Sequence, residues 1–234
     1  MKSRFLIFLI FIIVLLNSCS STTTLTIYTD QQLTDGAVAV KEMMKEAYAA
    51  SIEKTRDGMD TIDNETLFNP TQRNQFQQGR ELPGVEKRLN TFKKQLNSDL
   101  NTVFDSLFDQ TTMWIDEMTI TDPYNYILGE KDSITKFFRE TAFDKLNEYL
   151  IRELNDKETL KSTFNNYLTI INAYIITGKT SLDTNTIEVM KKWDPSNLTA
   201  FLANEIAKEM ATQETIIRYL APSYDSPYIQ LFSK

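Results

Sequence analysis

The sequence predicts an all-α protein, a compact bundle of about five to seven helices with an ordered irregular segment near residues 60–83. Five long stretches place apolar residues three, four or seven positions apart, which is the spacing of one helix face. Sustained alternation of apolar and polar residues, the mark of a half-buried strand, is absent from the sequence. The six prolines fall between these stretches and not inside them, as expected of residues that interrupt helices.

The first helix is expected from about Leu33 to near Gly58, with Thr34 or Asp35 as its N-cap. Residues 60–83 then lose the helical pattern and are rich in Asn, Gln and Thr, with interruptions at Pro70, Gly79 and Pro83. That composition is typical of a loop. Because loops of this length are uncommon in compact domains, an ordered connection is expected.

The clearest helix is predicted over 85–118, where one apolar stripe continues for more than thirty residues: Val85, Leu89, Phe92, Leu96, Leu100, Val103, Leu107, Trp114 and Met118. Asp122 and Pro123 indicate a new helix start, because Asp is a good N-cap and Pro is tolerated at the first helical position. Gly129 would close this short helix in the left-handed conformation.

Three further helices complete the prediction. The first begins near Asp132 or Ser133 and continues to Leu154, with Phe137 and Phe138 on its apolar face. The second covers 160–175 and ends at Gly178, a typical C-cap. The last covers 198–220, after a polar stretch that would hold one short helix at 184–192.

The N-terminus carries an export signal. Residues 5–16 are all apolar, follow Lys2 and Arg4, and lead into Leu16-Asn17-Ser18-Cys19, which includes the only cysteine of the chain. This arrangement resembles the lipobox of bacterial lipoproteins, although Asn17 is a less usual occupant. We expect removal of residues 1–18 and lipidation of Cys19, followed by a tether over 19–32 and a single helical domain over 33–234.

The alternatives to lipidation are an ordinary secretory signal and an uncleaved membrane anchor. Twelve apolar residues span about 18 Å as a helix, short of the roughly 30 Å hydrocarbon core, which disfavours a spanning anchor. The expected location is the bacterial cell envelope, on a membrane and facing the periplasm or the surface. Resemblance to enterobacterial sorting rules favours the outer membrane, because Ser20 and not Asp follows Cys19.

Composition excludes several functional classes. Loss of Lys2 and Arg4 with the signal would take the net charge from −7 to −9, and so acidic a body is not expected to bind nucleic acid. Without histidine the chain cannot form Ser-His-Asp or Cys-His sites or His-ligated zinc. The six glycines form no phosphate-binding loop. We therefore expect no cofactor, no metal and no catalytic residue.

Three motifs lie close together near the middle of the chain: Met118-Thr119-Ile120-Thr121-Asp122, Ile127-Leu128-Gly129, and Ile134 to Arg139. Together they resemble the central signature of a domain-of-unknown-function family of helical bacterial envelope proteins. Weaker similarities are Leu67 to Pro70 with Leu82-Pro83, and Leu198 to Arg218. The chain departs from the family pattern at Pro123, at the position of Gly129, and in a less acidic run over 210–214. The resemblance implies a helical periplasmic or lipid-anchored protein and carries no known activity.

The candidate signature residues are Asp122, Gly129, Phe137, Phe138 and Arg139. A buried carboxylate beside Arg139 could bind a polar ligand. The simpler interpretation, which we favour, is that Asp122 caps a helix and Arg139 pairs with a carboxylate to orient two helices.

Two tryptophans, Trp114 and Trp193, could line a groove, but such amphipathic side chains more often pack in a core. The favoured function is a non-catalytic interaction or scaffold protein, with the membrane and an envelope protein as partners. A carrier holding an apolar ligand between helices and a carboxylate-only hydrolase are the alternatives. An internal apolar cavity would favour the carrier, and exposed aromatic and aliphatic side chains on a solid bundle would favour the scaffold.

Overall fold

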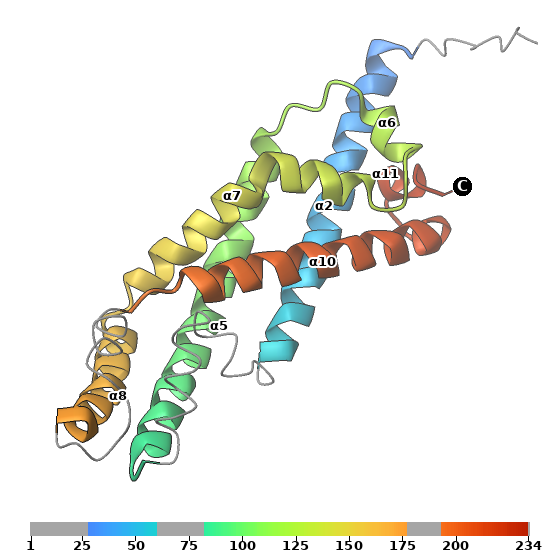
Figure 1. Cartoon of the computed structure of the whole chain (residues 1–234). Coiled ribbons are helices and arrows are strands. Elements are labelled where there is room, and N and C mark those ends of the chain that lie inside the picture. Colours follow the sequence, from blue (N-terminus) through green and yellow to red (C-terminus); the bar gives the residue numbers. More distant parts are fainter. Residues whose placement is uncertain (1–27, 60–81, 177–192, 234) are drawn as a thin grey trace, which may run out of the picture. The chain divides into compact units, whose positions relative to one another are not determined.

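A computed structural model describes residues 28–59, 82–176 and 193–233, and within these ranges all regular elements are helices, without a strand. The described residues form seven α-helices and one 3-10 helix, which confirms the all-α prediction (Figure 1). The elements are α2 (Asp30–Gly58), α5 (Val85–Glu117), α6 (Pro123–Ile127), α7 (Ser133–Asn155), α8 (Glu158–Ile176), α10 (Ser196–Leu220), η2 (Ala221–Ser223) and α11 (Pro227–Gln230). None of these helices is both long and apolar enough to cross a bilayer.

The chain divides into two units, Met1–Gln32 and Leu33–Lys234. In the first unit, the described residues contain the start of α2. The Thr29 hydroxyl accepts a hydrogen bond of 3.2 Å from the backbone N–H of Gln32, and the Gln32 side chain accepts one of 2.9 Å from the N–H of Thr29. This reciprocal pair is a capping box. The predicted N-caps Thr34 and Asp35 are therefore wrong, since the helix begins four residues earlier than Thr34.

In the second unit, helix boundaries follow the sequence closely. Helix α5 begins at Val85 and ends at Glu117, one residue from the predicted end, and α2 ends at Gly58 as expected. Several predicted features lie outside the described residues. They are the expected signal (1–18), Cys19, most of the segment 60–83, Gly178 and the helix expected at 184–192.

Large aromatic side chains join the long helices of the second unit. The ring of Tyr48 in α2 lies 5.7 Å from that of Phe138 in α7, and both side chains are fully buried. The Tyr48 hydroxyl also accepts a hydrogen bond of 3.0 Å from the buried Thr111 hydroxyl of α5. A single tyrosine therefore links α2 to two other helices.

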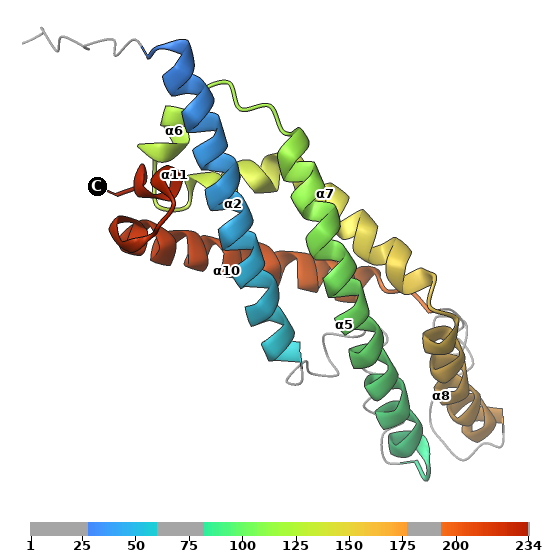
Figure 2. The ribbon, with the colours of Figure 1, turned by 180° about the vertical axis from the view of Figure 1, so that it is seen from behind.

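Ion pairs at the surface fasten α2 to α5. Lys45 lies 2.6 Å from Asp116, and Arg56 lies 2.6 Å from Asp105. Figure 2 shows α2 and α5 side by side, with α10 crossing both. Because the charged groups of these pairs are partly exposed, each contributes roughly 0–1 kcal/mol, and the apolar core supplies most of the stability.

Candidate functional site

The most enclosed charged group among the described residues is the carboxylate of Glu214 in α10, which is fully buried. It accepts hydrogen bonds of 3.1 and 2.8 Å from the backbone N–H groups of Ile134 and Thr135, and one of 2.8 Å from the Thr135 hydroxyl. These N–H groups belong to the first turn of α7, where no carbonyl within the helix can accept them. A side chain from α10 therefore caps α7.

Arg218, one turn further along α10, completes the cluster. Its Nε and Nη2 donate hydrogen bonds of 3.1 and 2.8 Å to Oε1 of Glu214. Nη1 donates to the carbonyl oxygen of Ile127 at 3.1 Å, and Nη2 also reaches the carbonyl oxygen of Tyr126 at 2.8 Å and the Ser133 hydroxyl at 3.0 Å. Because α6 ends at Ile127, Arg218 satisfies carbonyl groups at the C-terminal end of α6.

The C-terminal segment closes over this arginine. The ring centroid of Phe232 lies 4.8 Å from Cζ of Arg218, a cation–π distance. The Phe232 side chain is itself buried. Arg218 therefore joins α6, the start of α7 and the chain after α11 to one position on α10.

The bonding of this cluster indicates what it does. Both Glu214 oxygens accept from the protein. Arg218 donates to three protein groups besides Glu214 and also stacks on the ring of Phe232. A buried ion pair must recover the free energy lost on leaving water, and hydrogen bonds of this number and geometry are what allow it. The cluster therefore fastens three segments of the fold together.

The predicted signature residues lie around this cluster but do not form it. Asp122 is exposed at the N-cap position of α6, where its side chain accepts from the Asn125 amide at 2.6 Å and makes no capping bond to the backbone. The expectation that Asp122 caps this helix through its side chain is wrong. Pro123, in contrast, stands at the start of the helix as predicted, and its side chain is buried.

Arg139 also differs from its expected role. It is exposed, donates to the Asn204 side-chain oxygen of α10 at 3.3 Å, and lies 5.6 Å from the ring of Phe143. It thus connects α7 to α10 through an amide, whereas we expected a carboxylate. The nearby acid Asp116, near the end of α5, is bonded to α2 through Lys45 and Lys41.

Gly129 has a steric role in place of a conformational one. Gly84 is the only described residue with a positive φ, so Gly129 does not close α6 in the left-handed conformation. A Cβ atom at Gly129 would instead overlap the carbonyl oxygen of Asn125 and press on the Ser133 side chain. The close approach of the backbone therefore accounts for glycine at this position.

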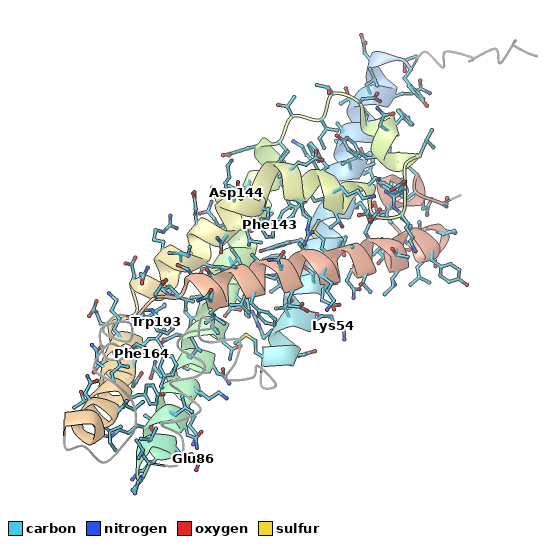
Figure 3. The ribbon with its side chains drawn as sticks, viewed as in Figure 1. Lys54, Glu86, Phe143, Asp144, Phe164 and Trp193 are labelled. Atoms are coloured by element: carbon cyan, nitrogen blue, oxygen red, sulfur yellow. The ribbon has the colours of Figure 1, made fainter. Side chains whose placement is uncertain are left out.

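The aromatic candidates lie in the core or pack against it. Phe138 is fully buried, while Phe137 is half-buried with its ring 4.8 Å from that of Tyr126. Trp193 packs against Phe164 at 5.3 Å (Figure 3). Trp114 meets Tyr149 edge-on at 6.0 Å. Packing, and not a groove, explains the positions of both tryptophans.

A surface recess of about 290 Å³ lies between α5 and α8, lined by Arg88, Thr91, Thr163 and Asn166. Arg88 donates to the carbonyl oxygen of Asn166 at 2.8 Å across it. It lies at the surface and its four described lining residues all carry polar groups, so it is not the internal apolar cavity that would favour the carrier alternative.

Sequence reasoning included Glu214 and Arg218 only as part of a family-like segment and missed their role. A signal exists, because a charged residue at 214 interrupts an apolar stripe that continues through Ile206, Met210 and Ile217. A charge four residues later, at Arg218, supplies a partner on the same face.

Comparison with known proteins gives one finding. The family model described as a protein of unknown function (DUF4197) matches residues 30–226. No curated protein and no solved structure matches the chain. The match covers every helix described here except α11, and the chain therefore belongs to the DUF4197 family.

Proposed function

We propose that this chain is a lipid-anchored protein of the bacterial cell envelope that acts by binding and catalyses nothing. The support for the anchor is the basic start, the apolar stretch 5–16 and the lipobox-like Leu16 to Cys19. Several acyl chains on one cysteine would hold the protein at a membrane, since each buried methylene contributes about 0.8 kcal/mol.

The observation that carries the non-catalytic part is the bonding of Glu214 and Arg218. A general acid or base must leave an atom available to a substrate within hydrogen-bond reach. Both carboxylate oxygens of Glu214 instead accept from α7 and from Arg218. The most enclosed acidic group of the described fold therefore serves as a fastening.

The second half of α5 offers a surface for a protein partner. Met113 is 57% exposed and lies one helical turn from each of the exposed Asp109 and Glu117. With a mature net charge of −9, this body would attract a partner whose contact surface is basic. An exposed apolar side chain between two carboxylates suits such a surface.

The anchor is tested by metabolic labelling with a fatty acid. Wild-type protein should take up the label, and the Cys19→Ala variant should not. Mass spectrometry of the wild-type protein should also show that residues 1–18 are absent. Equal labelling of the two forms would overturn the anchor.

The binding role is tested by crosslinking in cells with the anchored protein. Capture of a specific envelope protein should fall for Met113→Lys and Asp109→Lys, because each places a positive charge on the acidic face. Glu86→Lys is the matched control, since Glu86 is exposed on the same helix but lies at its other end (Figure 3). Capture should also fall for Cys19→Ala, which releases the body from the membrane.

One result would overturn the non-catalytic proposal. It is turnover of a peptidoglycan, lipid or phosphoester substrate by the purified body, with loss of that turnover on substitution of Asp122 or Glu117. Both residues are exposed carboxylates at the end of α5 and the start of α6.

A further inference from the structure

Exposed apolar side chains gather where α10 ends. Tyr219 is 84% exposed and Leu128 is 51% exposed, and Leu220 and Leu231 are also exposed. We call these four residues the apolar end. Single apolar residues on a protein surface are common, but several exposed together often mark a contact with another molecule. Tyr219 and the three leucines form such a group where α10 ends.

The contacts of Arg218 bring the four residues together. Tyr219 and Leu220 directly follow Arg218 in α10. Leu128 directly follows Ile127, and the carbonyl oxygen of Ile127 accepts a hydrogen bond of 3.1 Å from Arg218. Leu231 directly precedes Phe232, whose ring lies 4.8 Å from the guanidinium of Arg218. Both views of the ribbon show α11, the end of α10 and the connection between α6 and α7 in one place (Figures 1 and 2).

The charged groups next to the apolar end largely cancel. Lys136 lies within ion-pair distance of both Glu130 and Asp132, and Lys131 balances the remaining negative charge of this connection. Glu214 neutralises Arg218. The exposed carboxylates of Asp225 and, at the start of α6, Asp122 are not balanced in this way. An anionic lipid surface would therefore repel this end less than it repels the whole acidic body.

The expected lipid on Cys19 is close in the sequence to the start of α2, the helix that packs against α6. Gly36 in α2 lies against α6, since a Cβ atom there would be 2.8 Å from Cγ of Pro123. The five residues of α6 rise only about 7.5 Å before Leu128. Cys19 is 11 residues before Asp30, where α2 begins, and 11 residues reach at most about 40 Å even when fully extended.

We propose that the apolar end lies in the surface of the membrane that carries the Cys19 lipid, with Tyr219 and Leu128 among the head groups. This inference rests on the proposed anchoring and adds an orientation to it. Tyrosine suits such a position because its ring is apolar and its hydroxyl remains hydrated. The acidic face of α5 would then be left for a protein partner.

The experiment uses full-length lipidated protein in phosphatidylcholine vesicles, with and without bromine on the acyl chains. Lipid occupies the only native thiol, so an added cysteine is a unique site for an environment-sensitive fluorophore. Labels at Tyr219→Cys and Leu128→Cys should be quenched about twofold or more by brominated lipid, because interfacial side chains enter the outermost 5–10 Å. Labels at Glu86→Cys and Met113→Cys should be quenched by less than about a tenth.

The outcomes separate the two proposals. If the protein carries no lipid and does not bind vesicles, the proposed anchoring fails. If it is lipidated and bound but the Tyr219 and Leu128 labels remain unquenched, only the orientation fails. Shielding of those labels that depends on protein density and not on brominated lipid would show that a second copy covers the apolar end, and would also overturn the inference.

Discussion

Glu214 and Arg218 lie one helical turn apart on α10, joined by two hydrogen bonds to the same carboxylate oxygen. Each residue then satisfies backbone groups of a different helix. Glu214 accepts from two N–H groups of α7, and Arg218 donates to two carbonyls at the end of α6. One local pair thus sets the position of a connection that lies about 80 to 90 residues earlier in the sequence.

We expect Glu214→Gln to lower the free energy of unfolding by about 3–5 kcal/mol. The amide nitrogen cannot accept a hydrogen bond, and Arg218 would remain buried without a counter-charge. Urea denaturation of the body from Ser20 onward measures the change. Glu205→Gln is the matched control on the same helix, because its ion pair with Lys208 is at the surface and is worth at most about 1 kcal/mol. Equal losses in the two variants would show that the buried pair has no special role.

Phe138→Ala should cost about 3–5 kcal/mol, because it removes a fully buried ring and leaves a cavity beside Tyr48. Phe137→Ala should cost less, since that ring is only half-buried. For the same reason, we expect Phe138→Asp to unfold the body more completely than Phe137→Asp does. Thermal unfolding followed by circular dichroism compares the variants, and the opposite ranking would contradict the packing described here.

Gly129→Ala should destabilise the body by about 1–3 kcal/mol, because the new methyl group would overlap the backbone carbonyl of Asn125. Gly58→Ala is the control, since a Cβ atom there meets nothing within 4 Å. That change should be neutral or stabilising by up to about 1 kcal/mol, because alanine favours a helix more than glycine does. A harmless alanine at 129 would show that the backbone there can shift.

Local patterns predicted the helices of the described fold well. The stripe from Val85 to Met118 corresponds to α5 within one residue, because an amphipathic helix needs only its own periodicity to be recognised. The capping box of Thr29 and Gln32 was also readable, since it is a four-residue motif, but it was missed because the apolar stripe begins later.

The cluster around Glu214 could not be derived in the same way. Asp122 and Asp132 stand at N-cap positions where sequence rules predict side-chain caps, yet neither makes one. The N–H groups of α7 are instead capped by Glu214, from a segment 79 and 80 residues away. A spacing rule covers only residues on one element, so a cap supplied by another helix appears only after the helices are packed.

Tyr48 provides a test of the core by pH. Burial raises the pKa of its hydroxyl well above 10, its usual value in an unfolded chain. The folded state therefore keeps this proton at pH values where the unfolded state loses it, and stability is complete below about pH 10 and falls as pH rises further. We expect denaturation curves to show this loss for the wild type and a smaller one for Tyr48→Phe, which has no proton to release. Tyr219→Phe should behave like the wild type, because that side chain is exposed in the folded state. Parallel pH dependence of Tyr48→Phe and the wild type would show that the Tyr48 hydroxyl ionises without unfolding, and that the contact with Thr111 is open to water.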